Sequence, residues 1–256
     1  MRTNVPGGLR VVALTGAGDR VAEARLRHGD HPDVVLAEAG WLIESPAFAT
    51  VRDDGALELA FHVSELDGIR PRADREARVR RDPGVGDDEV GEPFQRVATY
   101  AVVWSERGLL LTQFSSQTHV SGDWGLPGGG LEEGESPVEG VHREVWEETG
   151  QRIELGQLLV VQSQHWVGRA PSGDLEDFHA VRIVYAATCP EPTDVVIHDV
   201  GGTTADARWV PAERLGDYRL SASWRALGLL EDPAQPAQGD DRGRPKGAGG
   251  AAYDAP

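Results

Sequence analysis

The sequence predicts an α/β fold, with a small α+β module at residues 1–66 and a larger domain at residues 94–230. Apolar runs of strand length are interspersed with helical segments in both parts. Residues 67–93 are rich in charge, Pro and Gly, and are therefore predicted to be a linker. Residues 231–256 are rich in Pro, Gly and Ala, which predicts a disordered tail.

Composition limits the classes of function open to this chain. Its 256 residues carry a formal net charge of −17, which repels nucleic-acid phosphates, so we expect a small-molecule partner and no nucleic acid. No apolar run approaches membrane-spanning length, and the N-terminal residues lack the pattern of a signal peptide. Cys189 is the single cysteine, so no disulfide can form within the chain and we expect a cytoplasmic protein.

The N-terminal module is predicted to contain strands and one helix. Residues 9–15, LRVVALT, favour a strand, and residues 19–29, DRVAEARLRHG, predict a short helix. Residues 40–63 predict strands broken by Pro46, with Asp54 and Gly55 forming the turn of a hairpin. Three roles are open to this module: it forms a homodimer, it covers a site, or it sets specificity.

The larger domain carries further strand signals and a C-terminal helix. Two strands form a hairpin around SERG, two more are separated by a loop, and one leads into a helix. In chain order, these strands are predicted at residues 94–104, 108–114, 155–166, 178–188 and 207–210. The last helix is predicted at residues 220–230.

The best defined helix of the chain is predicted at residues 137–149. Ser136 and Glu139 have the spacing of a capping box, Pro137 occupies the first helical position, and Gly150 can end the last turn. Three valines are expected to face the core from this helix: Val138, Val141 and Val145.

The same helix gathers three carboxylates on one side. At about 100° per residue, Glu144, Glu147 and Glu148 share an arc of about 100°. Like charges at this spacing repel, and a bound cation would remove that repulsion. The glycines at residues 128–130 let the backbone approach a ligand closely. A glycine loop before clustered carboxylates suits Mg²⁺, which prefers oxygen ligands.

Residues 129–151, GGLEEGESPVEGVHREVWEETGQ, resemble the signature of the Nudix hydrolase family. That signature is Gly, five residues, Glu, seven residues, Arg-Glu, an apolar residue, any residue, Glu-Glu, any residue, Gly and a bulky apolar residue. The matching positions are Gly129, Glu135, Arg143, Glu144, Val145, Glu147, Glu148 and Gly150. Gln151 departs from the apolar residue usual at the end, but that position packs and does not catalyse. The resemblance covers roughly residues 94–229.

This resemblance implies an α/β/α sandwich with a mixed sheet and a pyrophosphohydrolase. Its substrate would be a nucleoside diphosphate linked to another moiety: an ordinary or oxidised nucleoside triphosphate, ADP-ribose or a nucleotide sugar. Hydrolysis would release a nucleoside monophosphate. The alternative is a non-catalytic Nudix module that senses a metabolite or regulates a partner. Retention of every glutamate of the signature favours the enzyme.

The resemblance also implies roles for the signature residues. Glu144, Glu147 and Glu148 would hold Mg²⁺ or Mn²⁺, together with the carbonyl of Gly129. Arg143 would orient these glutamates and counts with them among the catalytic residues. Glu135, the other glutamate of the signature, would stabilise the unit of loop and helix.

A carboxylate from a later loop is expected to join the metal site. Asp199 and Glu176 are the two candidates. Asp199 is favoured, because its place before the strand at residues 207–210 resembles where the family puts this acid.

Three residues around the loop at residues 165–178 are candidates for substrate binding. Trp166 and Phe178 would stack on a base, or alternatively close the edge of the core. Arg169 would donate to a phosphate, or alternatively be a solvated loop arginine. His165 and His179, in the same region, are expected to be loop or core histidines.

Overall fold

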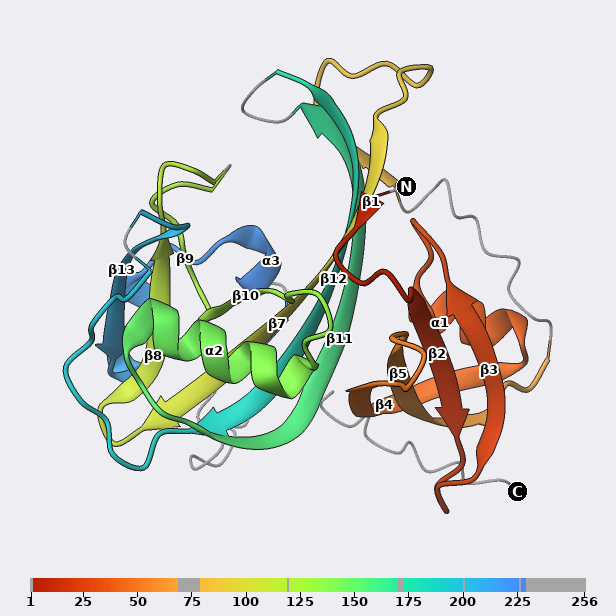
Figure 1. Cartoon of the computed structure of the whole chain (residues 1–256), viewed down its shortest axis with the longest axis horizontal. Coiled ribbons are helices and arrows are strands. Elements are labelled where there is room, and N and C mark those ends of the chain that lie inside the picture. The colour runs from red at the N-terminus through yellow and green to blue at the C-terminus, as the bar shows by residue number, and fades with distance from the viewer. Residues whose placement is uncertain are drawn as a thin grey trace, which may run out of the picture.

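The structure is a computed structural model whose described residues are 2–68, 79–118, 120–169, 173–199, 201–225 and 227–228. It contains a four-stranded sheet in the N-terminal module and a nine-stranded mixed sheet in the larger domain, with helices packed on them (Figure 1). The predicted α/β class with a mixed sheet is therefore confirmed. The tail predicted at residues 231–256 lies outside the described residues.

The N-terminal sheet has the strand order β3-β2-β5-β4. β2 is parallel to β5, whereas the pairs β2–β3 and β4–β5 are antiparallel. The elements of the module are β2 (Leu9–Leu14), β3 (Arg20–Leu26), α1 (Pro32–Glu38), β4 (Trp41–Val51) and β5 (Leu57–Glu65).

The helix predicted at residues 19–29 is wrong, because this segment forms strand β3. Ala22, Ala24 and Leu26 recur at every second position and pack against the core from one face of the strand. Apolar side chains at every second residue are the pattern of a strand, and the prediction of a helix did not take this spacing into account. The helix of the module instead forms at α1, with Pro32 in its first turn.

The hairpin between β4 and β5 has the predicted turn. The backbone N–H of Arg52 donates to the carbonyl of Ala56 at 2.9 Å, and Gly55 adopts a φ of +75°. Asp54 accepts a hydrogen bond from the N–H of Ala56 at 3.1 Å. The strand break predicted at Pro46 is wrong, because β4 continues through this residue with register shifts beside it. Proline is tolerated here because β4 is an edge strand.

The larger sheet has the order β13-β8-β7-β12-β11-β6, with three short strands beside this path. The central pair, β7 and β12, is parallel, and β11–β12 and β13–β8 are antiparallel. The strands are β1 (Arg2–Thr3), β6 (Val79–Arg81), β7 (Glu92–Ser105), β8 (Gly108–Phe114), β9 (Trp124–Gly125), β10 (Gly128–Gly130), β11 (Glu154–Arg169), β12 (Leu175–Thr188) and β13 (Thr204–Val210). Every strand predicted in this domain is present. β6 lies within the predicted linker, of which residues 69–78 are outside the described residues.

Helix α2 (Pro137–Thr149) lies across one face of this sheet (Figure 1). Its capping box is formed as predicted, and Gly150 ends it with a φ of +71°. Val141 and Val145 are fully buried, but the prediction for Val138 is wrong because its side chain is exposed. Val138 lies at the outer edge of the valine arc, about 120° from Glu144.

The C-terminal part of the domain contains two short helical segments. The 3₁₀ helix η2 (Ala212–Asp217) follows β13, and α3 (Ala222–Arg225) follows η2. The helix predicted at residues 220–230 is thus represented by α3, while residues 226 and 229–230 lie outside the described part of the chain. No helix among the described residues is long and apolar enough to cross a membrane.

The N-terminal module is integrated with the larger sheet. β1 pairs with β7, and the side-chain amide of Asn4 donates to the carbonyls of Val97 and Leu131 at 2.8 and 2.9 Å. One apolar core cluster contains Leu59 from the module and Ile183 from the larger sheet. The module therefore packs directly on the domain that carries the Nudix-like signature.

Candidate metal and catalytic site

The site begins where the glycine strand β10 meets helix α2. Gly129 pairs with Thr99 of β7, which holds the strand across the start of the helix's acidic face. A Cβ atom on Gly129 would lie 2.5 Å from Oε1 of Glu144. Only a glycine therefore lets the backbone lie directly against this carboxylate.

Arg143 connects the predicted signature residues into one network. Its guanidinium donates twice to Glu135, at 2.7 and 2.8 Å, and once to the carbonyl of Gly130 at 3.0 Å. It also donates to Glu144 and Glu147, each at 3.0 Å. Arg143 thus fixes the two glutamates against the loop that precedes the helix.

The network is reflected in the proton affinity of its members. Burial raises the pKa of Glu135, but the hydrogen bonds from Arg143 and from the N–H of Glu132, together with the charge of Arg143, outweigh it and lower the pKa overall. Hydrogen bonds to Glu135 are in turn the main reason that the pKa of Arg143 is raised above its ordinary value. Both groups are therefore charged across the ordinary pH range.

Glu148 lies behind this network and is almost completely buried. Its carboxylate accepts a hydrogen bond from the N–H of Gly128 at 2.9 Å and another from the hydroxyl of Thr204. Burial raises its pKa to about 8, against both hydrogen bonds, and the charges of Glu144 and Asp199 raise it further. Burial is thus the main reason that Glu148 keeps its proton more readily than an ordinary glutamate.

Asp199 is brought to the same place by the loop before β13. Its backbone N–H donates to the carbonyl of Glu147 at 3.1 Å. Burial also raises the pKa of Glu144.

A cavity of about 520 Å³ is lined by Arg96, Gly129, Arg143, Glu144, Glu147, His198, Asp199, Gly202 and Thr203. The second candidate for the later-loop acid, Glu176, lies in β12 opposite Gly168 and does not line this cavity.

These residues fit a hard divalent cation. Glu144, Glu147 and Asp199 line the same cavity and could supply carboxylate oxygens, and Gly129, which also lines it, could supply a backbone carbonyl. Burial is the main reason that the pKa of Glu148 is raised, the charges of Glu144 and Asp199 add to it, and a cation nearby would favour the ionised carboxylate. Mg²⁺ and Mn²⁺ both prefer such an oxygen-rich donor set.

The predicted substrate contacts separate into two places. Trp166 and Phe178 are partners across β11 and β12, with ring centroids 4.5 Å apart, and both line a cleft of about 870 Å³. Arg169 does not line that cleft, because its guanidinium donates to Glu89 at 2.7 Å and to the carbonyl of Gly173.

Several residues of the site carried no sequence signal that we used. Arg96 lines both the cleft and the acidic cavity. It could have been noticed as the one cation in the apolar stretch at residues 94–104. Thr204 and His198 become site residues only through the path of the loop before β13, which the sequence pattern does not specify.

Two further sequence interpretations concern packing near the end of α2. Gln151 is buried, as expected for its position, and donates to Thr193 Oγ1 at 3.0 Å while accepting from the Thr193 N–H at 2.9 Å. Cys189 is also buried. Neither residue faces the acidic cavity.

Comparison with known proteins places this site in a family context. The family model of the NUDIX domain matches residues 94–230. The nucleoside triphosphatase NudI of Enterobacter sp. (strain 638) is 37% identical over 134 residues, which cover 51% of this chain and 92% of that protein. A MutT-like protein of Streptomyces ambofaciens is 47% identical over 69 residues, or 27% of this chain and 43% of the relative. This chain therefore spans less than half the length of the second relative.

A solved structure also matches about half of this chain. The crystal structure of the MutT protein from Methanosarcina mazei Go1 is 28% identical in sequence, with a TM-score of 0.41. The match covers 52% of this chain and 89% of that chain.

Proposed function

The chain belongs to the Nudix family, and from that premise we propose that it is a Mg²⁺-dependent pyrophosphohydrolase acting on a nucleoside triphosphate. It hydrolyses the diphosphate linkage and releases a nucleoside monophosphate. The name of the relative from Enterobacter, a nucleoside triphosphatase, supports this substrate over ADP-ribose and nucleotide sugars.

One observation carries the proposal: Arg96 lies on the wall of both the acidic cavity and the larger cleft. Within the part of the chain that the structure describes, its guanidinium has no hydrogen bond or salt bridge. A Cβ atom on Gly130 would lie 2.9 Å from its Nη2, so the guanidinium rests on the glycine strand. Such a cation is suited to a phosphate that extends from the cleft to the metal-binding carboxylates.

The cleft supplies a surface for the nucleoside. Trp166 and Phe178 present aromatic rings on its wall, and Tyr100 and Trp224 line it as well. Stacking of a base on an aromatic ring contributes about 1–3 kcal/mol. We therefore assign Trp166 and Phe178 to binding of the base and Arg96 to binding of the phosphates. Arg169, which pairs with Glu89, is not assigned to the substrate.

In the reaction, the carboxylates and Arg143 have separate roles. Glu144, Glu147 and Asp199 hold the divalent ion, and Arg143 keeps the first two in position through its hydrogen bonds. When bound, the ion neutralises the diphosphate and acidifies the attacking water. Glu147 and Asp199 face the cavity, so one of them accepts the proton of that water.

The experiment that tests this proposal combines a substrate panel with variants of Arg96. With millimolar Mg²⁺, wild type should release mononucleotide fastest from a nucleoside triphosphate, ordinary or oxidised. Arg96→Ala should raise KM by about 10- to 100-fold, because a hydrogen-bonded charge contributes about 1.5–3 kcal/mol. Arg107→Ala, which removes an exposed arginine distant from the cavity, is the matched control.

Two results would count against the proposal. If folded wild type cleaves no member of the panel, the metabolite-sensing alternative replaces the enzyme. If Arg96→Ala leaves KM unchanged for the preferred substrate, the phosphates do not follow the path between the cleft and the acidic cavity.

A further inference from the structure

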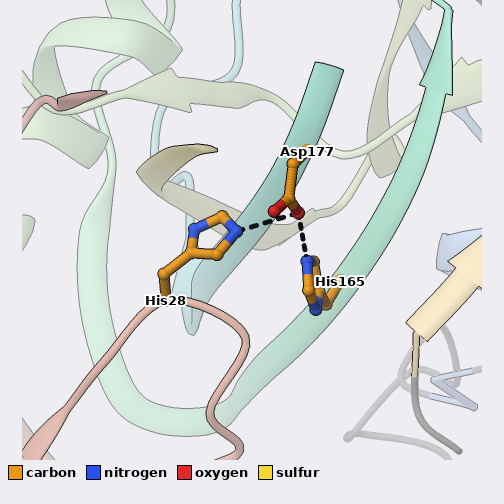
Figure 2. A group of neighbouring side chains, drawn as sticks. All are labelled: His28, His165 and Asp177. Carbon is orange, nitrogen blue, oxygen red and sulfur yellow. Dashed lines mark hydrogen bonds and ion pairs between the residues drawn. The ribbon is translucent and has the colours of Figure 1, made fainter. Parts of the chain in front are cut away.

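A second group of metal-binding side chains lies apart from the acidic cavity, where the N-terminal module meets β11 and β12. It consists of His28, His165 and Asp177 (Figure 2). One ligand atom from each residue lies within 4.8 Å of the other two. The three residues come from separate elements: the loop between β3 and α1, strand β11 and strand β12. Folding of the module on the sheet therefore assembles a donor set of two imidazoles and one carboxylate.

The contacts within this cluster converge on a single oxygen. Oδ1 of Asp177 lies 2.9 Å from Nε2 of His28 and also contacts Nε2 of His165. An ionised carboxylate only accepts hydrogen bonds, so each ring carries its proton on Nε2 in this state. Nδ1 of His28 is buried and has no hydrogen-bond partner among the described residues. Nδ1 of His28 can therefore carry the ring proton when Nε2 binds a metal ion.

The loop that carries His28 is held in place independently of the cluster. Gly29 adopts a φ of +74°, and a Cβ atom there would lie 2.8 Å from Nδ1 of His165. Its N–H donates to Nδ1 of His179 at 3.1 Å. The hydroxyl of Ser163 donates to the carbonyl of Asp30 at 3.0 Å. These contacts fix the loop against β11 and β12, so the donor set is formed in advance.

His179 lies beside the cluster but is not one of its ligands. Its Nδ1 accepts from Gly29, and its Nε2 lies 2.8 Å from the hydroxyl of Ser163, so both ring nitrogens are occupied. This neutral, hydrogen-bonded state matches the pKa of His179, which burial lowers to about 3. His179 is therefore a core histidine, whereas His165 shares its carboxylate partner with a histidine of the module.

We propose that His28, His165 and Asp177 bind one Zn²⁺ ion, with a water as the fourth ligand, and that this ion clamps the N-terminal module to β11 and β12. Imidazole nitrogen suits Zn²⁺, whereas Mg²⁺ prefers oxygen ligands. Two histidines, one carboxylate and a water complete a tetrahedral zinc site. The site is distinct from the carboxylates of α2 and goes beyond the proposed hydrolase function.

The cluster lies between the loop after β3 and strands β11 and β12, which suits an ion that links the N-terminal module to the larger sheet. The side chains of His28, His165 and Asp177 are 15%, 11% and 17% exposed, so all three ligands are largely buried. Side chains alternate between the two faces of a strand, so Trp166 and Phe178 point away from His165 and Asp177, although His165 also lines the cleft that contains the two aromatic rings. An ion here would hold the pair of strands β11 and β12, which carries Trp166 and Phe178.

The test measures Zn²⁺ binding to the untagged full chain in millimolar Mg²⁺, which occupies the carboxylates of α2. Calorimetric titration of wild type should give one Zn²⁺ per chain, and Co²⁺ should give the visible absorption of a tetrahedral site. His28→Ala should abolish both signals. His62→Ala, which removes another histidine of the module, and Glu147→Gln should retain them. Zn²⁺ should raise the melting temperature of wild type by about 5 °C or more.

The outcomes separate the proposal from its alternatives. Absence of Zn²⁺ binding by folded wild type would overturn the proposal and leave a hydrogen-bonded cluster. Binding that survives His28→Ala, or that is lost in Glu147→Gln, would assign the ion to another site and overturn it equally. Should His28→Ala fail to fold, as judged by circular dichroism, the Co²⁺ spectrum of wild type decides alone. A spectrum without tetrahedral absorption would then refute the zinc site.

Discussion

Replacement of Arg143 by lysine should weaken both the fold and the metal site, although it keeps the positive charge. Arg143 makes five hydrogen bonds: two to Glu135, one to the carbonyl of Gly130, and one each to Glu144 and Glu147. A lysine ammonium is a point donor and can keep about two of them. The side chain is 22% exposed, so each lost hydrogen bond contributes about 1 kcal/mol.

The expected loss is therefore about 3 kcal/mol, which lowers the melting temperature by about 6–12 °C. Glu144 and Glu147 also lose their common donor, and removal of such a supporting contact lowers metal affinity or activity by about 10- to 100-fold. Thermal unfolding followed by circular dichroism, with and without Mg²⁺, measures the first effect, and mononucleotide release measures the second.

The matched control is Arg107→Lys. Arg107 forms a single ion pair with Asp194 at 3.1 Å, and both side chains are exposed. This substitution should change stability by less than about 0.5 kcal/mol. If Arg143→Lys melts as the control does and keeps full activity, then Arg143 does not hold the loop and the glutamates in position.

Three other predictions follow from the same structure. Gly129→Ala places a methyl group on the Glu144 carboxylate and should lower activity at least about tenfold, whereas Gly16→Ala, where no atom lies within 4 Å, should not change it. Millimolar Mg²⁺ should raise the melting temperature of wild type by about 5–10 °C if it saturates the site, and an unchanged value would remove the evidence for a cation there. Tyr185→Phe should stabilise the protein by about 1 kcal/mol in urea unfolding at pH 8, because the buried Tyr185 hydroxyl has no partner among the described residues. Burial raises its pKa to about 12, so the stability of wild type should fall relative to the variant as the pH rises from 10 to 12, and parallel pH profiles would contradict this.

Helix α2 could be predicted from the sequence because its determinants are local. The capping box of Ser136 and Glu139, and Gly150 at the far end, specify where α2 begins and ends. The helical period then places the carboxylates on one side, and the structure brings Glu144 and Glu147 to one cavity wall. Strands β7, β8, β11 and β12 were predicted for the same reason, since each is a long apolar run.

The rest depends on contacts between segments distant in the sequence. β3 was interpreted as a helix because its small apolar residues fit both periods, and only pairing with β2 favours the strand. Arg96 joins the site because β7 pairs with the glycine strand β10, which no local pattern encodes. His28 meets His165 and Asp177 only when the module docks on the ribbon, so their individual sequence contexts carry no metal-binding signature.

The central claim is that the carboxylates on the cavity wall carry out Mg²⁺-dependent hydrolysis, and one measurement tests it most directly. Release of nucleoside monophosphate from a nucleoside triphosphate is compared between wild type, Glu147→Gln and the exposed control Glu154→Gln, with millimolar Mg²⁺ and with chelator. Glu147 is 40% exposed, so its substitution should leave the fold intact. The account predicts hydrolysis by wild type and Glu154→Gln that chelator abolishes, and a rate at least about 100-fold lower in Glu147→Gln. Equal rates in Glu147→Gln and wild type, or hydrolysis that persists in chelator, would contradict it.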